Sequence, residues 1–225
     1  MAVRHHPLPL APRAIPAWLL RVPGASHRSL AAGAGPGDGS RASEGELILV
    51  ERGALALGRE SSTGRAAVLA ILGPGDTLGP LPASAPARSA GSAAARVELR
   101  ALVPSEIVRV PAAGLRLTCG GDPSAAMELA LLLAGQADTL SRRLELALTA
   151  HVVERVHRTL RELAATHGIR RRGELGVEIG LPMTQDLLAA MVGATRESVN
   201  RALRVLSERG RVARHEGRYV LPGPS

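Results

Sequence analysis

Three charged side chains near the C-terminus have the types and the spacing to recognise base pairs. Arg196, Glu197 and Arg201 stand at the start of a predicted helix, outside its apolar stripe. Arginine can donate two hydrogen bonds to guanine O6 and N7, and glutamate can accept one from cytosine N4. A solvated helix face is the alternative interpretation for charges at such a position. The neighbouring elements favour base recognition over this alternative.

Residues 181–219 predict two helices joined by a tight turn. Thr184 can cap the first helix, and Gly193 can adopt the left-handed conformation that the turn requires. Thr195 can cap the second helix, with Ser198 in the capping-box position. Apolar residues at helical spacing give both helices one face for burial. They are Leu187, Leu188, Met191, Val192, Val199, Ala202, Leu203 and Leu206.

A small basic hairpin is predicted after the second helix. Gly210 can end that helix, and residues 212–214 and 219–221 can form two short strands around the turn at 215–218. Two helices, a glycine turn and such a hairpin make a winged helix-turn-helix. This module binds duplex DNA by placing its second helix in the major groove.

Residues 184–212 resemble the DNA-binding module of the Crp/Fnr family of bacterial transcription regulators. The resemblance rests on the Val192-Gly193 turn and on the Arg196-Glu197-x-x-x-Arg201 spacing. It implies base contacts from Arg196, Glu197 and Arg201. It implies phosphate contacts from Thr184, Gln185, Thr195 and Ser198, and a base contact added or altered by Asn200.

The composition agrees with a polyanionic partner. The chain has 225 residues and a net charge of +8, with arginine as its only strongly basic residue. Such a balance favours nucleic acid through counterion release, although a GC-rich coding sequence explains the arginine usage equally well. One cysteine, Cys119, excludes an internal disulfide and an iron–sulfur cluster held by several thiolates. No apolar run reaches the roughly 18 residues of a membrane span, and we expect a cytoplasmic protein.

The chain divides into four expected parts. Residues 1–45 are rich in Pro, Gly and Ala and predict a flexible extension, whereas short strands with frequent turns over 46–122 predict a small antiparallel roll. A long helix is expected over 123–150 and the winged helix-turn-helix over 151–225. The fold class is therefore α+β, with an N-terminal β-roll that resembles the cyclic-nucleotide-binding domain of the same family.

The resemblance weakens at the expected nucleotide pocket. Nucleotide-binding members place a glutamate after the glycine that corresponds to Gly79, whereas this chain continues Pro80-Leu81-Pro82. Proline also removes a backbone donor. The remaining candidates for an effector are Arg88, Ser89 and Arg96 in the roll, and Thr139 and Ser141 on the long helix. We expect no cyclic AMP in the family's usual manner, and either another effector or a purely structural roll.

The long helix is expected to pair with a second subunit. Leucines recur along it at spacings of three, four or seven, and more of them widen its apolar surface beyond one face. One side can pack on the roll and the other on a partner, as the resemblance also implies. The alternative is a helix buried within its own chain.

The leading hypothesis is a homodimeric regulator that binds a near-palindromic operator, with RNA polymerase as a further implied partner. No GxSxG, HExxH or Walker motif and no metal-ligand cluster occurs, so an enzyme is not expected. A DNA-binding protein that senses no ligand remains the alternative. Constant operator affinity across a panel of metabolites would distinguish it from a sensor.

Overall fold

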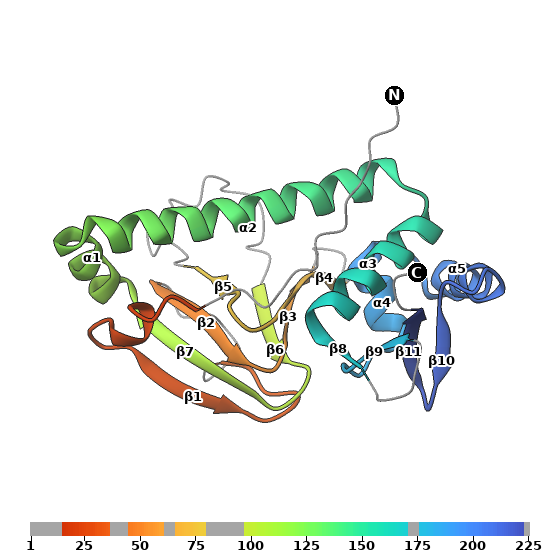
Figure 1. Cartoon of the computed structure of the whole chain (residues 1–225), viewed down its shortest axis with the longest axis horizontal. Helices are drawn as coiled ribbons and strands as arrows, with labels where there is room; N and C mark the ends of the chain where they lie inside the picture. The colour runs from red at the N-terminus through yellow and green to blue at the C-terminus, as the bar shows by residue number, and fades with distance from the viewer. Residues whose placement is uncertain (1–14, 37–44, 61–65, 80–96, 171–175, 223–225) are drawn as a thin grey trace.

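In a computed structural model, the described part of the chain comprises residues 15–36, 45–60, 66–79, 97–170 and 176–222. Its N-terminal half is a roll of two antiparallel sheets, with strand orders β1-β7-β2-β5 and β4-β3-β6 (Figure 1). The strands are β1 (Ser26–Leu30), β2 (Glu46–Arg52), β3 (Leu55–Glu60), β4 (Ala66–Leu72), β5 (Thr77–Leu78), β6 (Val97–Ala101) and β7 (Ser105–Pro111). The predicted roll is confirmed.

The strands bury apolar residues on both faces of the first sheet, because successive side chains alternate between the faces. Ile48, Val50 and Ile107 join residues of the second sheet in one buried cluster. Leu47, Leu49, Val108 and Val110 form another cluster with the N-terminal segment and the next helix. The turn that leads from β2 to β3, in the other sheet, needs glycine at Gly53, where φ is +88° and a Cβ would lie 2.7 Å from the Pro104 carbonyl oxygen.

Part of the segment expected to be a flexible extension belongs to the roll. Strand β1 pairs antiparallel with β7, and Ser26 lies opposite Arg109. The short 3-10 helix η1 (Leu19–Arg21) precedes it, with the Leu19 side chain completely buried. Composition alone concealed this strand, since Ser, His and Arg fill it and only Leu30 is buried.

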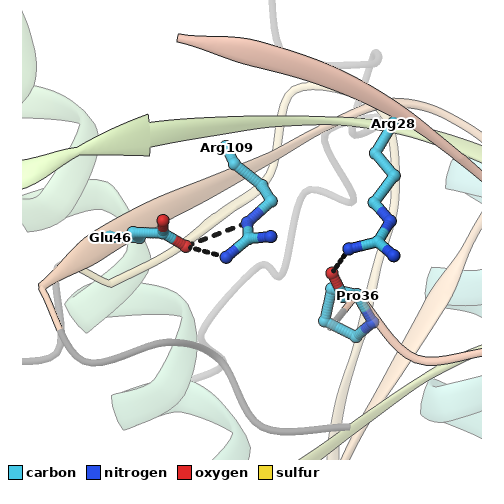
Figure 2. Close-up of polar contacts among 4 residues, drawn as sticks. All are labelled: Arg28, Pro36, Glu46 and Arg109. Atoms are coloured by element: carbon cyan, nitrogen blue, oxygen red, sulfur yellow. Dashed lines mark hydrogen bonds and ion pairs between the residues drawn. The ribbon is translucent and has the colours of Figure 1, made fainter. Parts of the chain in front are cut away.

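Polar side chains fasten β7 to β2 and β1 to the loop that follows it (Figure 2). The Arg109 Nε and Nη2 atoms both donate to Glu46 Oε2, at 2.9 and 2.6 Å. Both side chains are about three-quarters buried. Arg28 Nη1 donates to the Pro36 carbonyl oxygen at 3.0 Å. These bonds fix the N-terminal strand and the loop that follows it.

Two helices follow the roll. Helix α1 (Ala112–Gly121) was not anticipated, whereas α2 (Pro123–Thr149) matches the predicted long helix closely. Pro123 occupies its first turn, and the Asp122 carboxylate caps it by accepting from the Ser124 backbone N–H at 2.9 Å. Figure 1 shows α2 running along the roll. The Gln136 amide fastens it to β5 with bonds to the backbone carbonyl and hydroxyl oxygens of Thr77, at 2.8 and 2.6 Å.

The C-terminal unit packs three helices on a small sheet of order β10-β11-β9-β8. Its elements are α3 (Val152–His167), β8 (Gly168–Ile169), β9 (Gly176–Ile179), α4 (Gln185–Val192), α5 (Arg196–Glu208), β10 (Ala213–His215) and β11 (Arg218–Pro222). Helix α3 is strongly amphipathic and buries Val156, Leu160 and Leu163. His151 precedes α3 as its N-cap residue.

The C-terminal unit rests against the roll. Ala54 and Ile71 of the roll share one buried cluster with the core of the helical unit, and α4 lies against β4. His167 packs close to Gly73 of the roll, where an added Cβ would lie 2.8 Å from its Cε1 atom. Burial lowers the pKa of His167 below its ordinary value, and the charge of Asp76 partly opposes this shift.

This pKa shift predicts a loss of stability in acid. A histidine with a lowered pKa in the folded state contributes stability that is present above the unfolded value of about 6.5. That stability is lost as pH falls below 6.5 towards the folded pKa, because the unfolded chain binds the proton first. Urea unfolding of His167→Gln at pH 7.5 and pH 5.5 should therefore show a smaller acid destabilisation than the parent. His215→Gln, at an exposed wing residue, is the control and should follow the parent.

Candidate nucleic-acid interface

Helices α4 and α5 have the capping that their sequence predicted. The Thr184 hydroxyl accepts from the Leu187 backbone N–H at 3.0 Å, and the Thr195 hydroxyl accepts from the Ser198 backbone N–H at 3.2 Å. Gly193 ends α4 with φ of +61°, a conformation that other residues adopt at a cost. The chain therefore turns sharply between the end of α4 and the start of α5.

These caps give a prediction for stability. Thr195→Ala removes the acceptor for a backbone donor at the start of α5 and should lower the free energy of unfolding by about 1 kcal/mol. Thr195→Ser keeps the hydroxyl and should retain most of that stability. Urea denaturation monitored by circular dichroism measures both variants. Equal losses in the two variants would mean that the methyl group, and not the hydroxyl, carries the effect.

Helix α5 separates a buried stripe from a charged face. Val199, Ala202, Leu203 and Leu206 are buried, as predicted. Arg196, Glu197 and Arg201 are exposed, while Ser198 and Asn200 are partly buried. The two arginines and the glutamate thus lie on the accessible side of the first turns of the helix.

Glu197 stays ionised at the helix start. A hydrogen bond from its own backbone N–H lowers the pKa of its carboxyl group, and one from the Thr195 hydroxyl lowers it further. An ionised carboxylate only accepts hydrogen bonds. Glu197 can therefore accept from the amino group of cytosine, and it repels phosphate and the acceptor atoms of guanine.

Sequence reasoning missed two residues that the fold places beside Arg196. The carboxylate of Asp186, on the first turn of α4, lies 3.6 Å from its guanidinium group. The wing contributes Arg214, which lines a shallow hollow of about 530 Å³ together with Thr184, Gln185, Asp186 and Arg196. Because the hollow joins α4, α5 and the wing, it brings three of the predicted DNA-binding positions, Thr184, Gln185 and Arg196, around one surface. The only sequence feature that pointed to Arg214 was its place in a predicted strand, where successive side chains lie on opposite faces.

The wing is held firmly in this position. Its turn uses Glu216 and Gly217 at positive φ, +48° and +82°, as the tightest hairpin turns require. The Arg214 guanidinium lies 5.6 Å from the centre of the Tyr219 ring, within the range of a cation–π contact. Arg218 Nη1 donates to the fully buried Glu178 carboxylate at 2.9 Å. These contacts orient the basic edge of the hairpin towards α5.

The candidate effector residues are not brought together in the described residues. Arg88, Ser89 and Arg96 lie outside them. Thr139 and Ser141 bond along their own helix, to the carbonyl oxygens of Gly135 and Ala137, each at 2.9 Å. Thr139 lines a cavity between the roll and α3, whereas Ser141 is exposed. A separation of two residues places these hydroxyls on different sides of a helix.

The described residues contain no candidate metal site. Among them, no three His, Cys, Asp or Glu side chains lie close enough together to hold a metal ion. None of the helices in these ranges combines the length and apolar character needed to cross a membrane.

The C-terminal geometry has counterparts among known proteins. A family model described as a Crp-like helix-turn-helix domain matches residues 154–224. The CRP-like cAMP-activated global transcriptional regulator of Mycobacterium tuberculosis is 33% identical over 175 residues, which cover 78% of this chain and 74% of that protein.

Solved structures share the fold over most of the chain. FixK2 from Bradyrhizobium japonicum superposes with a TM-score of 0.69 at 22% identity, covering 88% of this chain and 92% of that one. TTHB099 from Thermus thermophilus, described as a transcriptional regulator of the CRP family, gives 0.67 at 23% identity and covers 87% and 91%. The c-di-GMP responsive global regulator CLP of Xanthomonas campestris gives 0.65 at 21% identity and covers 89% and 95%.

Proposed function

Because the chain belongs to the CRP/FNR family of bacterial transcription regulators, we propose that it acts as a homodimer on a near-palindromic DNA operator. The observation that carries this proposal is the start of α5, where Arg196, Glu197 and Arg201 are exposed and Arg196 shares one hollow with the basic wing residue Arg214. The proposal includes RNA polymerase as a partner and a cytoplasmic location, as the family resemblance implies.

In this proposal α5 lies in the major groove. Arg196 and Arg201 donate to guanines, and Glu197 accepts from a cytosine. Thr184, Gln185, Thr195 and Ser198 contact phosphates at the helix starts, where backbone donors and the helix dipole favour anions. Asn200 lies beside Arg196 and Arg201 on the helix and can adjust one base contact. Arg214 reaches the phosphates next to the groove.

Binding must also separate Arg196 from Asp186. Their ion pair is exposed and long, at 3.6 Å, so it contributes little stability and is readily exchanged for a guanine contact. In the free protein the Asp186 carboxylate holds the Arg196 guanidinium near the start of α5. The Arg196 side chain therefore loses less conformational freedom when DNA binds.

Dimerisation is proposed to use α2. Five large apolar side chains of this helix are exposed. Monomeric soluble proteins rarely leave so much apolar surface in contact with water. The five side chains are Met127, Leu131, Leu140, Leu144 and Leu148. Leu140, Leu144 and Leu148 follow one another at the four-residue spacing of a helix ridge. Two subunits paired along this ridge would present two α5 helices, which must lie about 34 Å apart to enter successive major grooves.

The sequence and the comparisons differ on whether the effector is cyclic AMP. The Mycobacterium tuberculosis relative is named as cAMP-activated, which does not support our expectation against a cyclic nucleotide. Pro80 nevertheless stands where nucleotide-binding members supply a carboxylate. We therefore propose regulation without cyclic AMP held in the usual manner. Because Gln136 already joins α2 to β5, a ligand-independent regulator with a structural roll is the second candidate.

Fluorescence anisotropy with a labelled duplex tests both parts of the proposal. The duplex carries TGTGA and its inverted partner, and a scrambled duplex serves as the control. Selective binding that is unchanged by cyclic AMP is the expected result. Selective binding only with cyclic AMP would overturn the effector part and would show a rearranged phosphate clamp. Equal binding to both duplexes, with and without the nucleotide, would contradict recognition of this family-type operator.

A further inference from the structure

A cavity of about 140 Å³ lies where the roll meets the C-terminal unit. Its walls come from β4 and the turn after it, from the second half of α2, and from α3 and α4. No single element encloses it, and its shape depends on how the helical unit rests on the roll. Its volume is close to the roughly 150 Å³ of a cavity known to accommodate benzene.

Arg155 lines the cavity and carries a buried hydrogen-bond donor that is unpaired within the described ranges. The Arg155 Nε atom is buried and has no hydrogen-bond partner among the described residues. Its Nη1 atom donates to the Ala147 carbonyl oxygen over 3.4 Å, a long bond. An unsatisfied buried donor of a charged group costs free energy, so the Arg155 guanidinium group is incompletely paired and favours an anion nearby. Thr159 lies one turn further along α3 and lines the same space.

The acidic groups around the cavity already have partners. Glu162 lies 3.6 Å from the Arg143 guanidinium, and the Asp76 carboxylate accepts from the Gly73 backbone N–H at 2.9 Å. The Arg155 side is therefore the region that favours an added negative charge. His167, which also lines the cavity, has a lowered pKa because it is buried. It is mostly neutral at pH 7 and adds little charge to the cavity.

The opposite side offers apolar contact. Leu69 is 44% exposed although it lies in a strand that packs against a helix, and Leu146 and Met191 also line the space. A ligand that covered Leu69 would remove apolar surface from water. Methionine adapts to ligands of different shape because its side chain is flexible.

We propose that this cavity binds a small monoanion with an apolar body of about the size of benzoate, with its carboxylate at Arg155. Because the walls belong to both units, the bound ligand favours one arrangement of the DNA-binding unit on the roll. This coupling rests on the proposed function, and it requires operator affinity and ligand affinity to change by the same factor. The site would thus provide an effector position outside the interior of the roll.

Calorimetric titration of the full chain with benzoate tests the site, with benzyl alcohol as the uncharged analogue. Concentrations up to about 10 mM are sufficient for a ligand of this size at a modest affinity per atom. Arg155→Met should weaken benzoate binding at least about tenfold, the effect of losing a charged hydrogen bond. Arg158→Met is the matched control, since Arg158 pairs with Glu154 on the same helix and does not line the cavity.

A second variant protects the test against misfolding. Leu69→Glu places a carboxylate at an exposed position, so the fold should persist while benzoate binding is lost. Absence of binding to the parent, or equal binding to the parent and to both variants, would overturn the proposal. Loss in Arg155→Met and Leu69→Glu with retention in Arg158→Met would support it.

Operator binding is measured separately, with and without benzoate. A change in the dissociation constant of about fivefold or more is expected, and it should be absent in Arg155→Met. Benzoate binding through Arg155 without any change in operator affinity would overturn the coupling. If the parent protein binds benzoate through Arg155 but binds no operator, the proposed ligand site stands and the proposed regulator function is refuted.

Discussion

Replacing Arg196 by alanine should abolish selective operator binding. Each arginine–guanine pair contributes about 1–3 kcal/mol of discrimination, and a homodimer loses two such pairs. The change also removes a guanidinium charge that offsets the nearby Asp186 carboxylate at the protein–DNA boundary, which adds repulsion from phosphate. Anisotropy titrations on the palindromic and scrambled duplexes should therefore give nearly equal affinities for this variant.

Two further variants separate base recognition from general attraction. Arg196→Lys keeps the charge but loses the planar pair of donors, so it should bind DNA with a similar salt dependence and with less selectivity. Arg214→Ala should weaken binding to both duplexes alike and reduce the slope against log salt, because Arg214 is proposed to contact phosphate. If Arg196→Ala binds as tightly and selectively as the parent, α5 does not recognise the operator through this residue.

A positive charge on the exposed ridge of α2 should separate the subunits. Leu144 is 60% exposed in the single chain, so Leu144→Arg leaves the fold of the subunit intact. In the proposed dimer the same position lies between two apolar helices, where an unpaired charge is strongly unfavourable. Sedimentation velocity should show a monomer. Operator affinity should fall by about 100- to 10,000-fold, because the second half-site no longer benefits from its high effective concentration.

The control for this prediction is Leu117→Arg. Leu117 is 69% exposed and lies on α1, away from the ridge, so its variant should remain dimeric and bind the operator normally. A dimeric Leu144→Arg with unchanged operator affinity would exclude this part of α2 from the interface. Monomers in both variants would point to a general effect of the added charge.

Features set by neighbouring residues were predictable. The roll strands, the long helix and the two helices around Gly193 follow from apolar periodicity and from capping and turn residues within a few positions of one another. The same is true of the exposed start of α5, since the apolar stripe fixes which side of that helix is buried. Strand β1 escaped detection because one buried residue, Leu30, gives no periodic pattern.

Contacts between distant segments were not predictable in this way. The sequence by itself determined the module, its charged face and the residues Arg196, Glu197 and Arg201. Only the tertiary structure placed Arg214 of the wing beside α4 and α5, and brought Arg155 and Leu69 to one cavity. The physical reason is that local patterns depend on backbone geometry over a few residues, whereas these meetings depend on how separate hydrophobic faces pack together. That packing is settled by the buried cluster that Ile71 of the roll shares with the C-terminal helices.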